Sequence, residues 1–168
     1  MKKDINKKII IGFSIGDYNG IGPEILLKSF MNSQLFDKCI PIIFCDKRIL
    51  EYYNNRFNYK LKIEKKDSSI TKFKDNILYT ISDEESQIII KPGYISKKAG
   101  NYSIKSLKNS IKHLEKNEIH GLVTLPISKI NSHSEFFSFP GHTEFLKSKY
   151  NVEDNIMIMY SKKQKFFL

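Results

Sequence analysis

Residues 8–25 read Lys-Ile-Ile-Ile-Gly-Phe-Ser-Ile-Gly-Asp-Tyr-Asn-Gly-Ile-Gly-Pro-Glu-Ile, and this stretch decides the class of fold. The near-continuous apolar run over residues 8–15 is typical of a parallel strand that is covered on both faces. Three glycines follow and permit a tight turn with close backbone approach. Pro23 and Glu24 suit the first turn of a helix. A strand, a glycine loop and a helix in this order indicate an α/β protein.

The glycine loop itself has two interpretations. Its position between a strand and a helix resembles a nucleotide- or phosphate-binding turn. Its pattern, Gly-x-x-x-Gly-x-Gly, matches neither the dinucleotide fingerprint nor the P-loop. A plain strand-to-helix connection is therefore the alternative.

The rest of the chain repeats the alternation of short apolar runs and helical segments. The clearest helix covers residues 100–117, where Ile104, Leu107, Ile111 and Leu114 fall three and four apart. Asp46 is predicted to cap a second helix that runs to about Tyr53. Strands are predicted at residues 40–45, 119–124 and 155–160, with a more exposed strand at 60–64.

Two further segments have less regular sequence patterns. Residues 65–85 are predicted to be polar and irregular apart from one apolar run at 77–79, and residues 162–165 to form a hairpin-like turn. The whole pattern predicts an α/β fold with a mainly parallel sheet flanked by helices and no internal domain boundary.

Composition excludes several classes of protein. Hydrophobic residues make up 40% of the 168 residues and charged residues 27%, which indicates a globular chain and not a disordered one. No apolar run approaches the length that spans a bilayer, and the basic N-terminus is expected to lead into a strand and not a signal peptide. Cys39 and Cys45 are too far apart for a Cys-x-x-Cys site and are predicted to be buried free thiols. A reducing, cytoplasmic location is expected.

The net charge of +10 raises the possibility of a nucleic-acid partner. However, 26 of the basic residues are lysines and only two, Arg48 and Arg56, are arginines, although arginine is preferred for reading bases and phosphates. The chain also holds 26 isoleucines and 13 asparagines, which indicates drift toward A+T-rich codons. A basic α/β module that binds nucleic acid is therefore the less favoured hypothesis.

Chemistry is expected at Phe139-Pro140-Gly141-His142-Thr143-Glu144-Phe145-Leu146. The Pro-Gly pair marks a turn, and the residues after it are predicted to open a helix whose N-terminus favours an anion. Upstream, residues 121–129 are predicted to form a strand and a turn that presents Lys129. Lysine, histidine and threonine around one opening suit a small phosphorylated substrate. The alternative is a capped helix with a satisfied histidine and a surface lysine.

Three blocks of the sequence resemble the 4-hydroxythreonine-4-phosphate dehydrogenase family. They are Gly-Asp-x-x-Gly-Ile-Gly-Pro-Glu-Ile over residues 16–25, Leu-Val-Thr-x-Pro-Ile-x-Lys over residues 122–129, and Phe-Pro-Gly-His-Thr-Glu-Phe-Leu over residues 139–146. They occur in the family's order and spacing across essentially the whole chain. The departures are Tyr18-Asn19, where the family usually has Pro-Ala, and Leu125, where a small residue is usual.

The resemblance implies a fold, a reaction and partners. The fold would be like that of isopropylmalate dehydrogenase. The reaction would be NAD-dependent oxidation and decarboxylation of 4-hydroxythreonine 4-phosphate in pyridoxal 5'-phosphate synthesis. It also implies a homodimer with its active site near the subunit interface, and a divalent metal cation. Carried over by position, His142 and Thr143 match the substrate-contacting pair, while Lys129 and Asp17 match a lysine and an aspartate of the other blocks.

The length of the chain limits how many of the family's features it can contain. The apolar run at 166–168 stops after three residues, so we expect residues 1–168 to be the N-terminal portion of a two-lobed dehydrogenase, incomplete at the C-terminus. The family's metal-binding histidines and its NAD-binding segment are expected beyond Leu168, so no metal or cofactor residue is assigned here. The chain alone is expected to be inactive. The alternative is a catalytically inactive remnant or binding protein of the same family.

Overall fold

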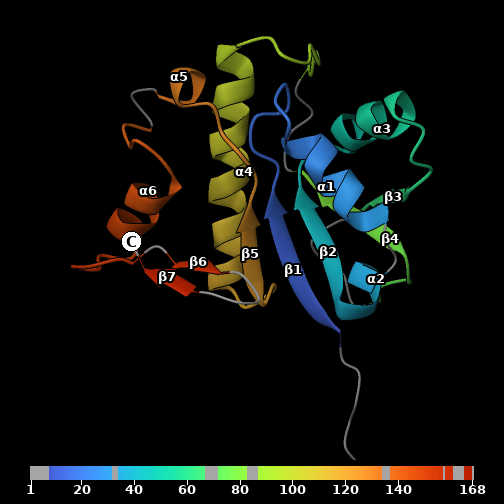
Figure 1. The fold of residues 1–168 in the computed structure, drawn as a ribbon. Helices are drawn as coiled ribbons and strands as arrows, with labels where there is room; N and C mark the ends of the chain where they lie inside the picture. Colours follow the sequence, from blue (N-terminus) through green and yellow to red (C-terminus); the bar gives the residue numbers. More distant parts are fainter. Residues whose placement is uncertain are drawn as a thin grey trace, which may run out of the picture.

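The computed structural model describes residues 8–31, 34–66, 72–82, 87–133, 137–156, 158–160 and 165–167. Strands and helices alternate along most of the chain (Figure 1). The strands are β1 (Ile9–Ser14), β2 (Cys39–Phe44), β3 (Lys62–Lys65), β4 (Ile77–Ile81), β5 (Gly121–Thr124), β6 (Ile158–Tyr160) and β7 (Lys165–Phe167). The helices are α1 (Gly22–Met31), α2 (Gln34–Lys38), α3 (Lys47–Arg56), α4 (Lys97–Glu115), α5 (Lys129–Ser132) and α6 (His142–Lys149).

A five-stranded sheet forms the centre of the molecule. Its strand order is β3-β4-β2-β1-β5, and every neighbouring pair is parallel. β1 pairs with β2 along its whole length, from Ile9 opposite Cys39 to Ser14 opposite Phe44. The predicted α/β fold with a mainly parallel sheet is confirmed.

Helices cover both faces of this sheet. Alternate residues of a strand point to opposite faces, so Ile43 of β2 packs with Leu26 and Leu27 of α1, whereas Ile42 packs with the residues beneath the C-terminal half of α4. α1 and α3 lie together on the first face, and α4 crosses β1, β2 and β5 on the second. The core is therefore two apolar layers separated by the sheet.

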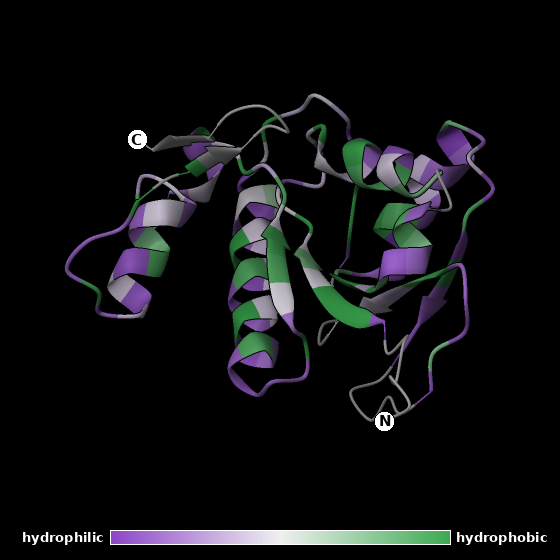
Figure 2. Cartoon of the chain, turned by 60° about the horizontal axis from the view of Figure 1, so that its bottom comes forward, coloured by the Kyte–Doolittle hydropathy of each residue, from purple (hydrophilic) through white to green (hydrophobic). Residues whose placement is uncertain are grey.

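The long helix α4 fixes the second face through both packing and polar contacts. Ile104, Leu107 and Ile111 are buried, as their spacing predicts, and the alternation of apolar and polar residues along the helix is visible in Figure 2. The buried hydroxyl of Ser106 donates to the carbonyl of Phe44 at 2.6 Å and accepts from the amide of Ile15 at 2.9 Å. One side chain thus joins the helix to the ends of two strands.

Several local predictions are confirmed. The carboxylate of Asp46 accepts from the backbone N–H of Arg48 and caps α3. Cys39 and Cys45 are buried free thiols, and burial raises the pKa of Cys45 well above its usual value. The structure also shows a turn at Lys91-Pro92-Gly93, which closes with a hydrogen bond from Tyr94 N–H to the Lys91 carbonyl.

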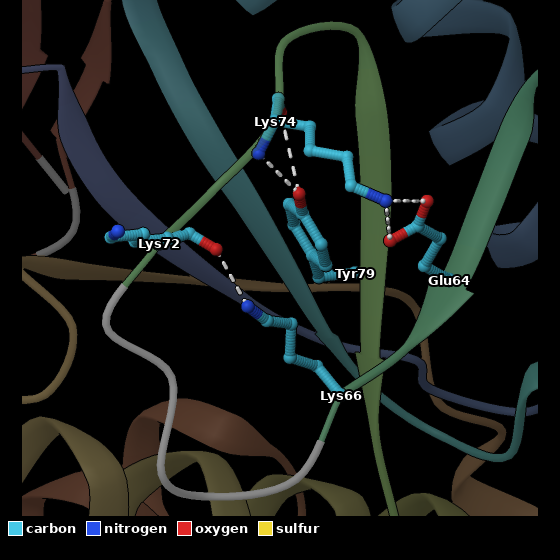
Figure 3. Close-up of polar contacts among 5 residues, drawn as sticks. All are labelled: Glu64, Lys66, Lys72, Lys74 and Tyr79. Carbon is cyan, nitrogen blue, oxygen red and sulfur yellow. Dashed lines mark hydrogen bonds and ion pairs between the residues drawn. The ribbon is translucent and has the colours of Figure 1, made fainter.

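The prediction of an irregular segment over residues 65–85 was wrong in its second half. Residues 77–81 form β4, whose five residues are all buried between β3 and β2. The polar residues before the strand make it hard to recognise in the sequence, but they contact the strand in the folded protein. The backbone N–H of Lys74, a residue that precedes the strand, donates to the Tyr79 hydroxyl (Figure 3). This short apolar run therefore becomes an interior strand of the sheet because of its tertiary contacts.

The expectation that residues 155–160 belong to the core sheet was also wrong. β6 pairs only with β7, in an antiparallel two-stranded sheet of its own. Ile156 and Ile158 are exposed, so the apolar run does not fill the core. The hairpin-like turn predicted at 162–165 falls largely outside the described residues, as does Leu168.

Candidate functional site

A change in strand order marks the place where a ligand is expected. β2 and β5 lie on opposite sides of β1. The chain leaves β1 toward α1 and β2, and it leaves β5 toward α5. In open parallel sheets, ligands bind outside the carboxyl ends of strands at such a switch point. The glycine loop after β1 and the segment 125–131 after β5 meet there.

Asp17 joins the two segments at this point. Its backbone N–H donates to the carbonyl of Pro126 at 2.9 Å, and its buried carboxylate accepts from the side-chain amide of Asn131 at 2.8 Å. The other carboxylate oxygen accepts from the backbone N–H of Asn19 at 2.8 Å. Both oxygens are therefore engaged within the protein, which suits a residue that shapes the loop.

The glycines of this loop are required by close packing. Gly16 has φ +67°, and a Cβ there would lie 2.2 Å from the carbonyl oxygen of Pro126. A Cβ on Gly22, at the start of α1, would lie 3.3 Å from the Cβ of Leu125. The loop after β1 is thus pressed against the backbone that follows β5, and larger residues would separate the two.

Tyr18 and Asn19, which depart from the family pattern, are both built into the protein. The Asn19 side chain accepts from the N–H of Lys91 at 2.8 Å and donates to the carbonyl of Tyr94 at 3.0 Å. The backbone carbonyl of Asn19 accepts from Gly93 N–H at 2.8 Å. Tyr18 is buried, and its carbonyl accepts from the Tyr53 hydroxyl. Asn19 therefore clamps the 91–94 turn to the glycine loop, a role that the sequence pattern did not reveal.

His142 is the first residue of α6, directly after the N-cap residue Gly141. Its side chain is partly buried, and its Nε2 atom is fully buried with no hydrogen-bond partner in the described part of the chain. Burial lowers the pKa of the imidazole below its usual value, so the ring is neutral at pH 7. A buried nitrogen without a partner is costly and suits a site that a ligand completes.

Thr143 follows on the same turn, and the helix is anchored behind the two residues. Phe145 is buried against Phe137 and Phe139, with ring centroids 5.2 Å and 5.4 Å away. The same cluster includes Ile111 of α4. The opening of α6 is therefore held in place by an aromatic cluster and by α4, which fixes the direction of its N–H groups.

Lys129 is the exposed first residue of the short helix α5. That helix packs against the start of α4, where the backbone of Asn131 leaves no room for a side chain at Gly100. The hydrogen bond between Asp17 and Asn131 brings Asp17 and the helix of Lys129 together. Among the described residues, no hydrogen bond or ion pair joins α5 to His142 or Thr143. Figure 1 places α5 near one end of α4 and α6 beside the same helix.

A pocket lies apart from these four residues. It has a volume of about 260 Å³ and is lined by the ends of β2 and β4 and by the polar side of α4, including Tyr102, Lys105 and Lys112. The Tyr102 hydroxyl, whose pKa burial raises, accepts from the N–H of Asp46 at 2.6 Å. The regular spacing of lysines on α4 is the only signal in the sequence that points to this pocket.

The described residues offer no metal centre and no membrane span. No three His, Cys, Asp or Glu side chains in the described ranges lie close enough to hold a metal ion. Two histidines have structural partners: His113 pairs with Glu118 at 2.5 Å, and His120 accepts from Ile10 N–H at 3.0 Å. Within the same ranges, no helix is long and apolar enough to cross a membrane.

Comparisons with known proteins point to one family. The family model of the pyridoxal phosphate biosynthetic protein PdxA matches residues 37–168. A 4-hydroxythreonine-4-phosphate dehydrogenase of Bacteroides thetaiotaomicron is 28% identical over 153 residues, which are 90% of this chain and 42% of the relative. A putative D-threonate 4-phosphate dehydrogenase of Clostridium botulinum is 31% identical over 152 residues, 89% of this chain and 46% of the relative.

The solved structures agree in fold. The crystal structure of a 4-hydroxythreonine-4-phosphate dehydrogenase from Burkholderia phymatum superposes with a TM-score of 0.85 at 24% identity. The match covers 96% of this chain and 49% of that one. The chain thus spans about half the length of the relatives that it matches.

Proposed function

The chain belongs to the family of the pyridoxal phosphate biosynthetic protein PdxA, and from this premise we propose that it is the N-terminal portion of an NAD-dependent dehydrogenase. The proposed reaction oxidises and decarboxylates 4-hydroxythreonine 4-phosphate in the synthesis of pyridoxal 5'-phosphate. Family membership and the name of the Bacteroides relative support this reaction. The portion described here would supply substrate contacts.

The observation that carries the proposal is the state of His142. Its Nε2 is buried and has no hydrogen-bond partner among the described residues, and its ring is neutral at pH 7. A neutral imidazole either donates or accepts one hydrogen bond at this nitrogen, according to its tautomer. A substrate hydroxyl or phosphate oxygen would complete it. The Thr143 hydroxyl and the N–H groups at the start of α6 would add donors for an anion.

Lys129 and Asp17 take different parts in this proposal. Lys129 is exposed and would bring a cation to the phosphate, where charge-assisted hydrogen bonds are strong. Asp17 uses both carboxylate oxygens within the protein, so it would act by holding the glycine loop against α5. It is a positioning residue, whereas Lys129, His142 and Thr143 would contact the substrate.

The cofactors belong to the proposal through the family. When bound, NAD accepts a hydride and a divalent cation polarises the substrate's hydroxyl. The described residues do not fit the metal, since they contain no cluster of three suitable side chains. We therefore assign neither group to a residue of this chain. A homodimer, a cytoplasmic location and the absence of a membrane partner complete the proposal.

A second substrate is supported by the Clostridium relative, whose name specifies D-threonate 4-phosphate. The two substrates share a four-carbon acid with a terminal phosphate and differ at C2, which carries an amine in one and a hydroxyl in the other. A non-catalytic binding protein of the same family is the remaining alternative. A nucleic-acid partner is not proposed, because nearly all of the basic residues are lysines.

Calorimetric titration of residues 1–168 tests the proposal. We expect 4-hydroxythreonine 4-phosphate to bind, and 4-hydroxythreonine without its phosphate to bind at least about tenfold more weakly, a difference of about 1.4 kcal/mol. Tighter binding of D-threonate 4-phosphate would favour the second substrate. Binding of neither phosphorylated compound would contradict the function. With NAD and Mg²⁺ added, we expect no NADH, and turnover above background would contradict the expected inactivity of this portion.

A further inference from the structure

Lys91 lies in a turn that three hydrogen bonds attach to the glycine loop. The Asn19 side chain accepts from Lys91 N–H at 2.8 Å and donates to the Tyr94 carbonyl at 3.0 Å. The backbone carbonyl of Asn19 accepts from Gly93 N–H at 2.8 Å. Asn19 is only 3% exposed. The backbone of Lys91 is therefore held by a buried residue, although Lys91 itself is exposed.

Two of these hydrogen bonds depend on the residue type at position 19. The family usually has alanine there, and an alanine side chain can neither donate nor accept a hydrogen bond. The Asn19 amide does both at once. This chain therefore holds Lys91 with a side chain that the usual family residue does not provide.

The ammonium group of Lys91 is also placed by a neighbour. Its Nζ atom lies 5.7 Å from the centre of the Tyr94 ring, within the range of a cation–π contact. Lys28 and Lys47, by contrast, pair with glutamates one helical turn away at 2.9 Å and 2.8 Å. In the part of the chain that the structure describes, Lys91 has no acidic partner of this kind.

Lys91 and Lys129 are attached to the same short stretch of backbone. Asn131, in the helix that Lys129 begins, donates to one oxygen of the Asp17 carboxylate at 2.8 Å. The other oxygen accepts from Asn19 N–H at 2.8 Å, and Asn19 in turn holds Lys91. Figure 1 shows α5 and the segment before α4 at the same end of α4. One buried network thus brings two exposed lysines to the switch point of the sheet.

The charges at this end of α4 favour an anion. The helix begins at Lys97, its first turn contains no acidic residue, and the N-cap residue Ser96 makes no side-chain cap hydrogen bond. The positive end of the helix dipole therefore adds to the charges of Lys91 and of the exposed Lys97 and Lys98. A negatively charged ligand would be stabilised beside the 91–94 turn.

We propose that Lys91 is a further substrate-contacting residue and that Asn19 positions it. The Lys91 ammonium group donates a charge-assisted hydrogen bond to an anionic group of the substrate, either its phosphate or its carboxylate. The inference rests on the proposed function, because the ligand is 4-hydroxythreonine 4-phosphate. It adds to that site a second lysine, which the family blocks do not contain.

Calorimetric titration of residues 1–168 with 4-hydroxythreonine 4-phosphate tests the role of Lys91. Lys91→Gln removes the charge, and we expect it to weaken binding by about fivefold to 20-fold. Lys91→Arg keeps a cation and should bind within about threefold of the wild type. Lys116→Gln is the matched control, because Lys116 is also exposed but lies at the opposite end of α4. It should bind like the wild type.

A double-mutant cycle tests the positioning by Asn19. Alanine is the usual family residue at this position, so Asn19→Ala suits the fold, and urea denaturation confirms that the variant is folded. In the Asn19→Ala background, Lys91→Gln should weaken binding by less than about twofold, because the turn is no longer held. An undiminished effect of Lys91→Gln in that background would overturn the role of Asn19.

The remaining outcomes separate this inference from the proposed function. Equal affinity of the wild type and Lys91→Gln would overturn the inference alone, whereas no binding by the wild type would overturn both. Equal losses in Lys91→Gln and Lys116→Gln would also overturn it, because net charge would then explain the effect. Titration with 4-hydroxythreonine, which lacks the phosphate, identifies the anion. A similar loss in Lys91→Gln assigns Lys91 to the carboxylate, and no loss assigns it to the phosphate.

Discussion

The side-chain amide of Asn131 donates a 2.8 Å hydrogen bond to the carboxylate of Asp17, 114 residues away in the sequence. Both side chains are buried, and the bond ties the loop after β1 to the helix after β5. The two segments form the switch point of the sheet. This charge-assisted contact therefore helps to position the candidate site, together with the hydrogen bond from Asp17 N–H to the Pro126 carbonyl.

Asn131→Asp would place two carboxylates in contact at this point. We expect a loss of about 2–3 kcal/mol in the free energy of unfolding at pH 7, since a charged hydrogen bond is replaced by repulsion. The repulsion raises the folded-state pKa of the pair, so the loss should be smaller at pH 5, where one proton is shared. Urea denaturation at both pH values measures this. Asn101→Asp on the exposed side of α4 is the control, and an equal loss there would contradict the account.

Gly16→Ala should destabilise the protein more than Gly93→Ala. Both glycines have positive φ, +67° and +79°, so each alanine carries a backbone penalty of about 1–2 kcal/mol. At Gly93 nothing lies within 4 Å of an added Cβ, whereas at Gly16 the carbonyl of Pro126 lies 2.2 Å away. We expect Gly16→Ala to cost about 3 kcal/mol or more in denaturant unfolding. Equal costs for the two variants would show that the loops are not in contact.

Ser106→Ala should lower the free energy of unfolding by about 1–3 kcal/mol, because the carbonyl of Phe44 and the N–H of Ile15 lose their partner in the core. Ser103 is also buried on α4, but among the described residues its hydroxyl contacts the carbonyl of Gly100 in the same helix and no strand. Ser103→Ala should therefore change stability by less than about 0.5 kcal/mol. Thermal unfolding of both variants makes the comparison, and similar effects would contradict the bridging role of Ser106.

The buried imidazole of His142 predicts a pH dependence of stability. Its pKa is lowered in the folded protein, so the unfolded chain binds the proton more tightly. The neutral ring's contribution is fully present above the unfolded pKa of about 6.5 and is lost as the pH falls through the folded pKa. We expect wild type to lose more stability between pH 7 and pH 5 than His142→Gln. His133→Gln, at an exposed position, should behave like wild type; if His142→Gln does too, the ring is not buried.

The sequence predicted the parts of the fold that local patterns encode. The strand predicted over residues 8–15, the capped helix after Asp46 and the apolar stripe of α4 are local patterns, and all three are confirmed. β4 was missed because a five-residue run between polar segments becomes a central strand only through its neighbours. The prediction for residues 155–160 was wrong because an apolar run does not specify which sheet it joins.

The candidate site was only partly visible in the sequence. The family blocks pointed to Asp17, Lys129, His142 and Thr143. The partner of Asp17 and the clamp made by Asn19 could not be read from the chain, because Asn131, Lys91 and Tyr94 approach them only in the folded protein. The buried nitrogen of His142 is likewise a property of packing.

The role of His142 as a substrate contact is tested most directly by calorimetric titration of three proteins with 4-hydroxythreonine 4-phosphate. These are the wild type, His142→Ala and His133→Ala, where the exposed His133 serves as the matched control. We predict that His142→Ala weakens binding by about tenfold to 100-fold, the cost of one lost hydrogen bond to a charged ligand, while His133→Ala binds like the wild type. Equal affinity of the wild type and His142→Ala would contradict the assignment of this site.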